Sequence, residues 1–346
     1  MKIGVTQKKS NKIFWKEMVT PYQVPEIKRS IWQLCNTVIP FLIVWFLMYL
    51  SLNVSYWLTL LLALPATGFL MRIFIIQHDC GHGSFFKSRK ANDTVGSFCG
   101  VLTLTPYHYW KKSHAIHHAN AGNLEHRGVG DVYTMTLDEY REKSAWERFT
   151  YRIYRNPVFL FVFAPTFLFV VLYRFSHPKA KGWKKERDSV HLTNLAILAI
   201  ALVLCYLIGW QAFLLIQAPI TILAATMGTW FFYVQHQYED TYWEHEGDWE
   251  YTEAALKGSS FYKLPKILQW FSGNIGFHHI HHLSPRIPNY KLEECHKENP
   301  VLQEVVELTL WDSLKTSLLT LWDEDQKKLI SFKDYKRRQQ METAGI

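Results

Sequence analysis

The chain has 346 residues, of which 49% are hydrophobic and 16% aromatic, and its formal net charge at pH 7 is +8. The apolar residues gather in long runs, which exclude an ordinary soluble globular protein and predict an all-α integral membrane protein. The positive excess is confined to a few segments, and we expect no nucleic-acid partner. The five cysteines contain no CxxC pair, which excludes a cysteine-built iron–sulfur or zinc site and a disulfide framework: Cys35, Cys80, Cys99, Cys205 and Cys295.

The N-terminal quarter predicts a cytoplasmic lead-in followed by two membrane spans. Residues 1–30 are polar, with seven Lys/Arg and two acids, and lack the pattern of a signal peptide. The apolar runs 31–52 and 54–76 each reach the roughly 20 residues that a helix needs to cross a bilayer core of about 30 Å. Only a short uncharged turn at Asn53 separates them, so we expect a helical hairpin.

Two groups of histidines follow the second predicted span. The first, His78-Asp-Cys-Gly-His82, has the spacing i, i+4, and the second, His114-Ala-Ile-His117-His118, has the spacing i, i+3, i+4. Both spacings place the rings on one face of a helix. The apolar stretch 95–105 between them is too short to span, so we predict a re-entrant or interfacial element that keeps both groups on one side.

Charge decides how the later apolar runs cross the membrane. Residues 174–190 carry six Lys/Arg and two acids, whereas the turn at 209–211 has none, so the first is predicted to be cytoplasmic and the second external. We therefore count four spans, the last two at 191–208 and 211–234. The run 157–173 is then re-entrant or interfacial. The alternative makes it a broken double pass, which gives six spans.

A third histidine group dominates the stretch 273–290, where four histidines fall within five positions. His278, His281 and His282 again have the spacing of one helix face, and His279 points elsewhere. His236 ends the last span as His78 follows the second, and we include it as a candidate ligand. Asn274, four residues before the group, is a candidate to hold a metal-bound water or a histidine nitrogen.

This histidine density predicts metal binding, because neutral imidazole is a preferred ligand of iron, zinc and copper. Eight nitrogens from the three groups are too many for one ion and suit two. A structural zinc site would be expected to use cysteine as well. A His-rich metal transporter is a further alternative, but transporters carry ionisable groups within their spans, and these spans carry almost none. The predicted ligands are His78, His82, His114, His117, His118, His236, His278, His281 and His282.

The three histidine groups, in this order, resemble the histidine boxes of the integral-membrane fatty acid desaturases. The phrases at 78–85 (HDCGHGSF), 114–131 and 273–292 are most similar to the bacterial acyl-lipid (phospholipid) desaturases of Δ5 type, and the likeness extends from about Ile31 to Asp325. The resemblance implies about four transmembrane helices with re-entrant or interfacial helices and a cytoplasmic helical cap that carries the boxes. It also implies two irons and a further histidine ligand outside the boxes, a role that fits His236.

The implied activity is an O₂-dependent desaturation that introduces a cis double bond into acyl chains of membrane phospholipids. A fatty-acid or alkane hydroxylase with the same di-iron histidine site is the alternative. The chain has no GxGxxG motif for a nicotinamide or flavin, so electrons must come from a separate protein, which the resemblance suggests is ferredoxin or flavodoxin. We expect a multi-pass protein of the plasma membrane whose active site and termini are cytoplasmic.

The expected organisation is a segment 1–30, a desaturase domain 31–325 and a basic cytoplasmic tail 326–346. The basic segments 174–187 and 327–338 are candidate docking surfaces for an acidic electron donor, because complementary charge speeds encounter. The same lysines are equally suited to anionic lipid headgroups. The acidic stretch 239–253 is expected to repel such a donor.

Overall fold

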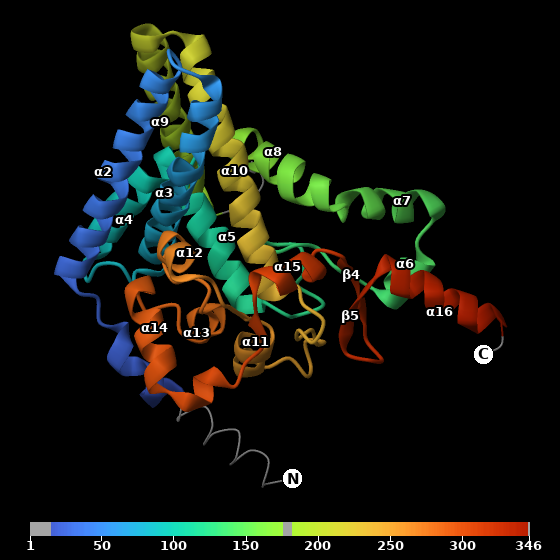
Figure 1. The fold of residues 1–346 in the computed structure, drawn as a ribbon. Coiled ribbons are helices and arrows are strands. Elements are labelled where there is room, and N and C mark those ends of the chain that lie inside the picture. Colours follow the sequence, from blue (N-terminus) through green and yellow to red (C-terminus); the bar gives the residue numbers. More distant parts are fainter. Residues whose placement is uncertain (1–14, 176–181, 345–346) are drawn as a thin grey trace.

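Four long helices dominate the protein, whose computed structural model describes residues 15–175 and 182–344 (Figure 1). Among the described residues, these four are long and apolar enough to cross a membrane: α2 (Ile27–Ser51), α3 (Tyr56–His82), α9 (Lys184–Ile208) and α10 (Trp210–His236). They confirm the predicted helical membrane fold with about four transmembrane helices. The first 14 residues of the predicted lead-in, and 176–181 of the basic segment, lie outside the described residues.

Helix α3 is the centre of the bundle. It packs against α2 and α10, and against the shorter α4 (Arg89–Leu102), α5 (Tyr107–Asn120) and α12 (Lys266–Phe271). Most of α3 is buried, whereas α9 is mostly exposed, as expected of an outer helix that faces lipid. The turn between α9 and α10 is Gly209, whose φ of 84° is readily adopted only by glycine.

Two shorter helical segments bring the chain back to the same side. Residues 95–102 form the second half of α4, which is too short to span and leads through a turn into α5. The run predicted at 157–173 forms η2 (Phe159–Phe163), α8 (Ala164–Val170) and η3 (Leu172–Arg174). Together these three elements form the segment Phe159–Arg174, which is bent by 60° from α7 (Ala145–Tyr154). This is the shape of a broken span or a re-entrant element. Its place relative to the membrane remains a prediction.

Small helices and five short strands form a cap below the bundle (Figure 1). Its helices are η1 (Thr20–Gln23), α6 (Leu137–Glu142), α11 (Tyr251–Lys257), α13 (His278–Leu283), α14 (Asn289–Glu298), η4 (Pro300–Gln303), α15 (Leu310–Thr316) and α16 (Phe332–Ala344). Its strands are β1 (Met135–Thr136), β2 (Phe261–Tyr262), β3 (Glu307–Leu308), β4 (Leu319–Asp323) and β5 (Lys328–Ser331). Strand β4 pairs parallel with β1 and antiparallel with β5, and β2 pairs parallel with β3.

The sheet corrects the prediction that residues 326–346 form a separate tail. The boundary at residue 325 falls inside the β4–β5 hairpin, and Ile330 and Tyr335 are buried in one cluster with Leu321 and Tyr140. Residues 326–344 therefore pack as part of the cap. The sequence pattern suggested a tail because basic residues cover the exposed face of α16.

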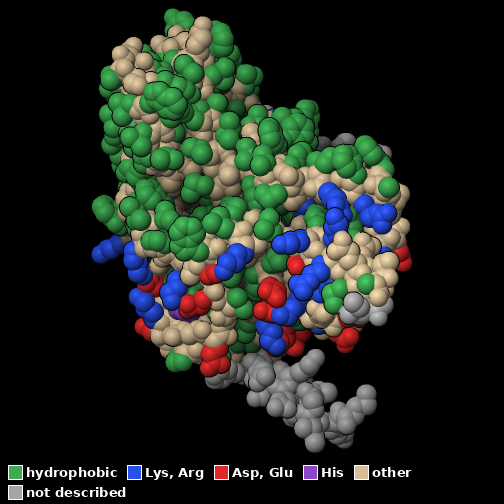
Figure 2. Space-filling view, turned by 45° about the vertical axis from the view of Figure 1, so that its right-hand side comes forward, with side chains coloured by type: hydrophobic (Ala, Val, Ile, Leu, Met, Phe, Trp, Pro, Cys, Tyr) green, Lys and Arg blue, Asp and Glu red, His purple; other side chains and the backbone are tan. Residues whose placement is uncertain are grey.

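Side-chain chemistry divides the molecule into two halves. Figure 2 shows hydrophobic side chains over nearly all of the upper half, whereas Lys, Arg, Asp and Glu gather over the lower half. Large apolar residues are exposed on the outer faces of the spans, for example Trp57 at 81% and Tyr206 at 89%. Such exposure is expected where lipid rather than water surrounds the helices.

Candidate metal centre

The predicted ligands all lie at the boundary between bundle and cap, where helix ends meet. The last turn of α3 carries His78 and His82, and the last residue of α10 is His236. Three histidines lie in the second half of α5 and three in α13, so the boxes enter the same space from four helices. Seven of the nine are buried, and His82 and His114 are partly buried.

Tight turns bring α13 into this position. The loop before it passes close to strand β2, where an added Cβ on Gly276 would lie 2.4 Å from the carbonyl oxygen of Tyr262, so no larger residue fits. On the other side, the Gln235 side chain donates a hydrogen bond to the backbone oxygen of Ile275 at 2.9 Å. The end of α10 and the third box are therefore fixed to each other.

The histidines form two adjoining groups, each with the geometry of a metal site. One group contains His78, His82, His114, His118 and His281, and the other contains His117, His236 and His282, with candidate ligand atoms within 4.8 Å of one another in each group. His278 joins the second group, because its Nε2 lies 3.0 Å from Nε2 of His236. The arrangement thus offers five nitrogens to one ion and four to a second.

The nitrogen separations fit ligands of a shared ion. Nε2 of His118 lies 3.1 Å from Nε2 of His114 and 3.0 Å from Nε2 of His281, and the Nε2 atoms of His117 and His236 are 3.3 Å apart. Imidazole binds an ion such as zinc at about 2.0–2.1 Å, which puts two ligand nitrogens roughly 3.0–3.4 Å apart. Mutual hydrogen bonds cannot satisfy such a cluster, since each neutral ring has only one N–H.

Burial keeps these rings in the form that binds metal. It lowers the pKa of His114, His117 and His118 well below the ordinary value of histidine, and neighbouring histidines add to this effect. The pKa values of the three box-three ligands, His278, His281 and His282, are lowered for the same reasons. The rings are therefore neutral at physiological pH, with a lone pair available on one nitrogen.

Several ring nitrogens also have no protein partner. Within the described part of the chain, Nε2 of His82 and of His282 are buried without a hydrogen bond. A buried, unsatisfied polar atom costs about 1–3 kcal/mol, so an accumulation of such atoms indicates a missing ligand. The residues present therefore fit a metal centre.

Two contacts that sequence reasoning missed orient the ligands. Oδ1 of Asp79 lies 3.1 Å from Nδ1 of His78, and its Oδ2 accepts hydrogen bonds from the backbone and side-chain nitrogens of Asn289 at 2.7 and 2.8 Å. Nδ1 of His236 donates to the carbonyl oxygen of Gly258 at 2.9 Å, which directs Nε2 toward the cluster. In the sequence, only the position of Asp79 inside the first box indicated a role beside the ligands. No sequence feature indicated such a role for Gly258.

Asn274 does not contact the histidines as expected. In the described residues, its side chain accepts a hydrogen bond from Gln269 at 2.9 Å and donates one to the backbone oxygen of Asn289 at 3.1 Å. Its φ of 58° shows that it forms the tight turn before the third box. The helix begins only at His278, so Asn274 and His278 do not share a helix face. A role of Asn274 in holding a metal-bound water stays a prediction.

His279 lies outside both groups. Its Nε2 is 3.0 Å from the backbone oxygen of Leu302, and the ring is fully buried between the box-three helix and the cap. Burial lowers its pKa to about 3. Its position agrees with the helical spacing, which turned this ring away from the other three.

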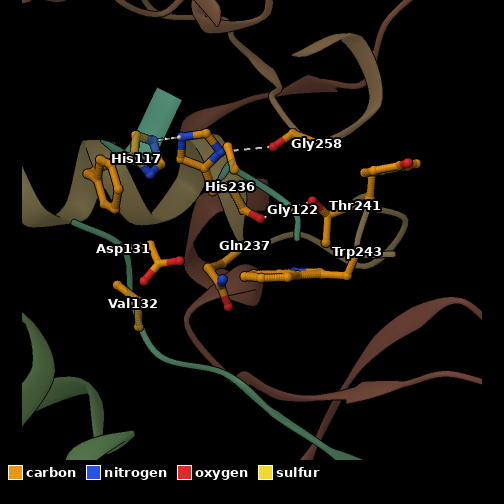
Figure 3. Close-up of a pocket in the computed structure, with 12 residues that line it drawn as sticks. His117, Gly122, Asp131, Val132, His236, Gln237, Thr241, Trp243 and Gly258 are labelled. Carbon is orange, nitrogen blue, oxygen red and sulfur yellow. Dashed lines mark hydrogen bonds between the residues drawn. The ribbon is translucent and has the colours of Figure 1, made fainter. Parts of the chain in front are cut away.

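A small pocket adjoins the second group on the cap side. Figure 3 shows His117 and His236 at one end of it, with Asp131, Gln237 and Thr241 beside them. Its volume of about 10 Å³ is near the lower limit for one water molecule. Burial raises the pKa of Asp131, whose carboxylate accepts a hydrogen bond from the backbone nitrogen of Gly128 at 2.7 Å.

A much larger apolar cavity, which we call the slot, adjoins the histidines on the bundle side. Its volume is about 750 Å³, and its walls come from α3, α5, α8 and α10. His78 and His114 of the first group and His278 of the second line it. From the histidines it extends into the bundle past Leu70, eight residues before His78, which corresponds to about 12 Å of helix. An extended apolar molecule would fit such a slot.

Comparison with known proteins agrees with this geometry. The sequence model of the family described as fatty acid desaturase matches residues 55–310. A Bacillus subtilis protein described as fatty acid desaturase is 51% identical over 320 residues, which cover 92% of this chain and 90% of the relative. Two Synechocystis proteins, an sn-1 acyl-lipid omega-3 desaturase (ferredoxin) and an sn-1 oleoyl-lipid 12-desaturase, are each 28% identical over 67% of this chain and 65% and 66% of their own lengths. The chain therefore belongs to the fatty acid desaturase family.

Proposed function

We propose that this desaturase binds two irons through its nine histidines and introduces a cis double bond into acyl chains of membrane phospholipids. The observation that carries the proposal is that histidines from both groups line one wall of an apolar slot. Nitrogen-ligated iron with open positions supplies the O₂ chemistry needed to remove hydrogen from an unactivated methylene. Product analysis separates this activity from hydroxylation of the same chain.

The protein's part in this chemistry is to hold the substrate and keep the site dry. The slot places a chain of methylenes beside His78, His114 and His278, while Phe74, Ile75 and Phe232 form apolar walls around it. The mostly apolar lining offers water few hydrogen-bond partners. The end of the acyl chain that passes beyond the histidines would lie between α3 and α10. The depth of the slot beyond the metal would therefore set which carbons of the acyl chain react.

The phospholipid substrate is supported by the named relatives and by the site's position. The Synechocystis relatives are described as acyl-lipid desaturases, and the slot is at the cap end of the bundle, where lipid headgroups would lie. The resemblance to Δ5-type enzymes suggests a double bond near the carboxyl end. We expect expression in a bacterium that makes no unsaturated fatty acids to yield monounsaturated phospholipids by mass spectrometry. Hydroxylated chains alone would reject desaturation.

We place the histidines and both termini in the cytoplasm, with the enzyme in the plasma membrane. Support comes from the contrast between charged and uncharged connections. Asn53 and Gln211 are both exposed, and the turns that join α2 to α3 and α9 to α10 lie at the end of the bundle away from the cap (Figure 1). In a variant with Cys35 and Cys205 replaced by serine, we expect cysteines at these two sites to react with an impermeant maleimide added to intact cells. A cysteine at Lys185 should react only after lysis, and labelling of Lys185 from outside would reverse the orientation.

The electron donor is proposed to be a separate ferredoxin or flavodoxin, since one relative is described with ferredoxin as its partner. The structure shows which lysines of the two basic segments have a carboxylate partner. Lys327 forms an ion pair with Glu244 at 2.8 Å, and Lys328 pairs with Glu239 at 3.1 Å, so the acidic stretch compensates both. The exposed side chains of Lys184 and Lys336 are the better candidates in the two basic segments.

Charge reversal tests this docking. We expect Lys184→Glu with Lys336→Glu to raise the donor concentration for half-maximal rate several-fold at low salt and less at high salt, because salt screens exposed charges. Iron content and the membrane-bound fraction should not change. The same charge change at Lys327 and Lys328 is the matched comparison and should have a smaller effect. Weakened membrane association with unchanged donor dependence would show that Lys184 and Lys336 serve lipid instead.

A further inference from the structure

A second apolar cavity, which we call the crevice, lies between α10, α12 and α15. It has a volume of about 220 Å³. Its lining is almost wholly apolar and includes Met71, Trp230, Phe231, Leu264, Leu268 and Phe271. Met71 and Phe231 also line the slot, so the two cavities share a wall. No step of the proposed reaction uses the crevice.

The crevice opens on a membrane-facing side of α10. Its α10 residues, from Thr226 to Phe231, lie five to ten residues before the end of this span at His236, which corresponds to roughly 8–15 Å of helix. That depth falls within one leaflet of a core about 30 Å thick. Met227, Trp230 and Leu268 are only partly buried, and Leu310 of α15 is 39% exposed, so the lining is accessible from outside.

The two short helices beside the crevice carry apolar side chains on their outer surfaces. Ile267 of α12 is 67% exposed, and Trp311 and Leu314 of α15 are 77% and 52% exposed. Figure 1 shows α12 and α15 at the height where α2 begins and α10 ends. Exposed Trp beside aliphatic residues at this level is typical of a helix in the membrane interface.

We propose that the crevice binds one acyl chain of a membrane phospholipid, separate from the substrate in the slot. A soluble electron donor does not fit, because charge complementarity guides such partners and the crevice offers almost no polar surface. A lipid chain fits because the crevice opens at leaflet depth and continues the apolar outer surface of α10. The proposal requires only that the protein lies in a membrane, and it does not depend on the di-iron chemistry.

Photocrosslinking tests the site with two adjacent positions on α12. A leucine-sized diazirine side chain at position 268 would face the crevice without filling it, whereas one at position 267 would face bulk lipid. After reconstitution in phosphatidylglycerol vesicles, both should capture lipid on irradiation. When extensive exchange into lipid-free detergent precedes irradiation, the lipid adduct should still form at position 268 and no longer form at 267. Parallel loss at both positions, which would mean bulk lipid only, or a protein–protein adduct at 268, would overturn the proposal.

A filling variant gives an independent measurement. Leu268→Trp should occupy the crevice and lower the phospholipid retained after the same detergent exchange by about one molecule per chain, with iron content unchanged. Leu314→Trp, on the outer surface of α15, is the control and should retain the wild-type amount. Equal retention by wild type and both variants would reject a bound chain, and this readout does not depend on turnover. Loss of iron in the filling variant would indicate disturbed folding, in which case Met227→Trp fills the same crevice from α10.

Discussion

Replacing His281 with alanine is expected to abolish desaturation and to remove iron from the site. His281 lies in the five-histidine group, and its Nε2 is 3.0 Å from that of His118, so its loss removes a nitrogen from the centre of the cluster. Changes to residues that only orient a ligand lower metal affinity or activity about 10–100-fold, so loss of a ligand should exceed about 100-fold. The measurements are iron per purified chain and the unsaturated fraction of cellular lipids.

The neighbouring His279 provides the matched control. It comes from the same helix and is equally buried, but its ring is hydrogen-bonded to the backbone oxygen of Leu302 outside both groups. His279→Ala should lower stability by about 1–3 kcal/mol, because that oxygen is left unsatisfied, while each folded molecule keeps its iron and activity. His279→Gln retains a donor and should lose less stability. Near-normal turnover and iron content in His281→Ala would contradict the ligand assignment.

The sequence predicted the membrane fold and the histidine groups because both depend on local patterns. Apolar runs of about 20 residues have few alternatives to a membrane helix, and the spacings i, i+3, i+4 define a helix face in any context. The spacing even separated His279 from its three neighbours. In the structure the nine predicted ligands form two adjoining groups. Spacing along the chain could not show which histidines belong to which group. Only the number of nitrogens, too many for one ion, indicated two sites.

The remaining features depend on contacts between distant segments. Asp79 is fixed by Asn289, 210 residues away, and His236 by the backbone of Gly258. The C-terminal hairpin was missed because β5 is only four residues long and is stabilised by pairing with β4 rather than by its own composition. Asn274, by contrast, was selected by a helical spacing applied across a tight turn with positive φ, and in the described residues its side chain bonds Gln269 and Asn289.

Asp79 connects the first and third histidine boxes. One carboxylate oxygen lies beside Nδ1 of His78, and the other accepts two hydrogen bonds from Asn289 at the start of α14, shortly after the third box. The Asp79 side chain is 2% exposed, so no water can replace these partners without rearrangement. Hydrogen bonds to a charged group each contribute about 1.5–3 kcal/mol, which makes this a stabilising as well as an orienting contact.

Substitution of Asp79 should therefore reduce metal binding without removing a ligand. We expect Asp79→Ala to lower activity and iron affinity about 10–100-fold, because the His78 ring loses its orientation and its nitrogen becomes less basic. Asp79→Asn keeps the shape and one acceptor, so it should fold better than Asp79→Ala and still bind iron more weakly than wild type. Asp138→Ala, which removes an exposed carboxylate paired with Arg141, is the control and should match wild type. If iron affinity stayed at the wild-type level in Asp79→Asn and Asp79→Ala while only thermal stability fell, the contact would hold the helices together without tuning the metal site.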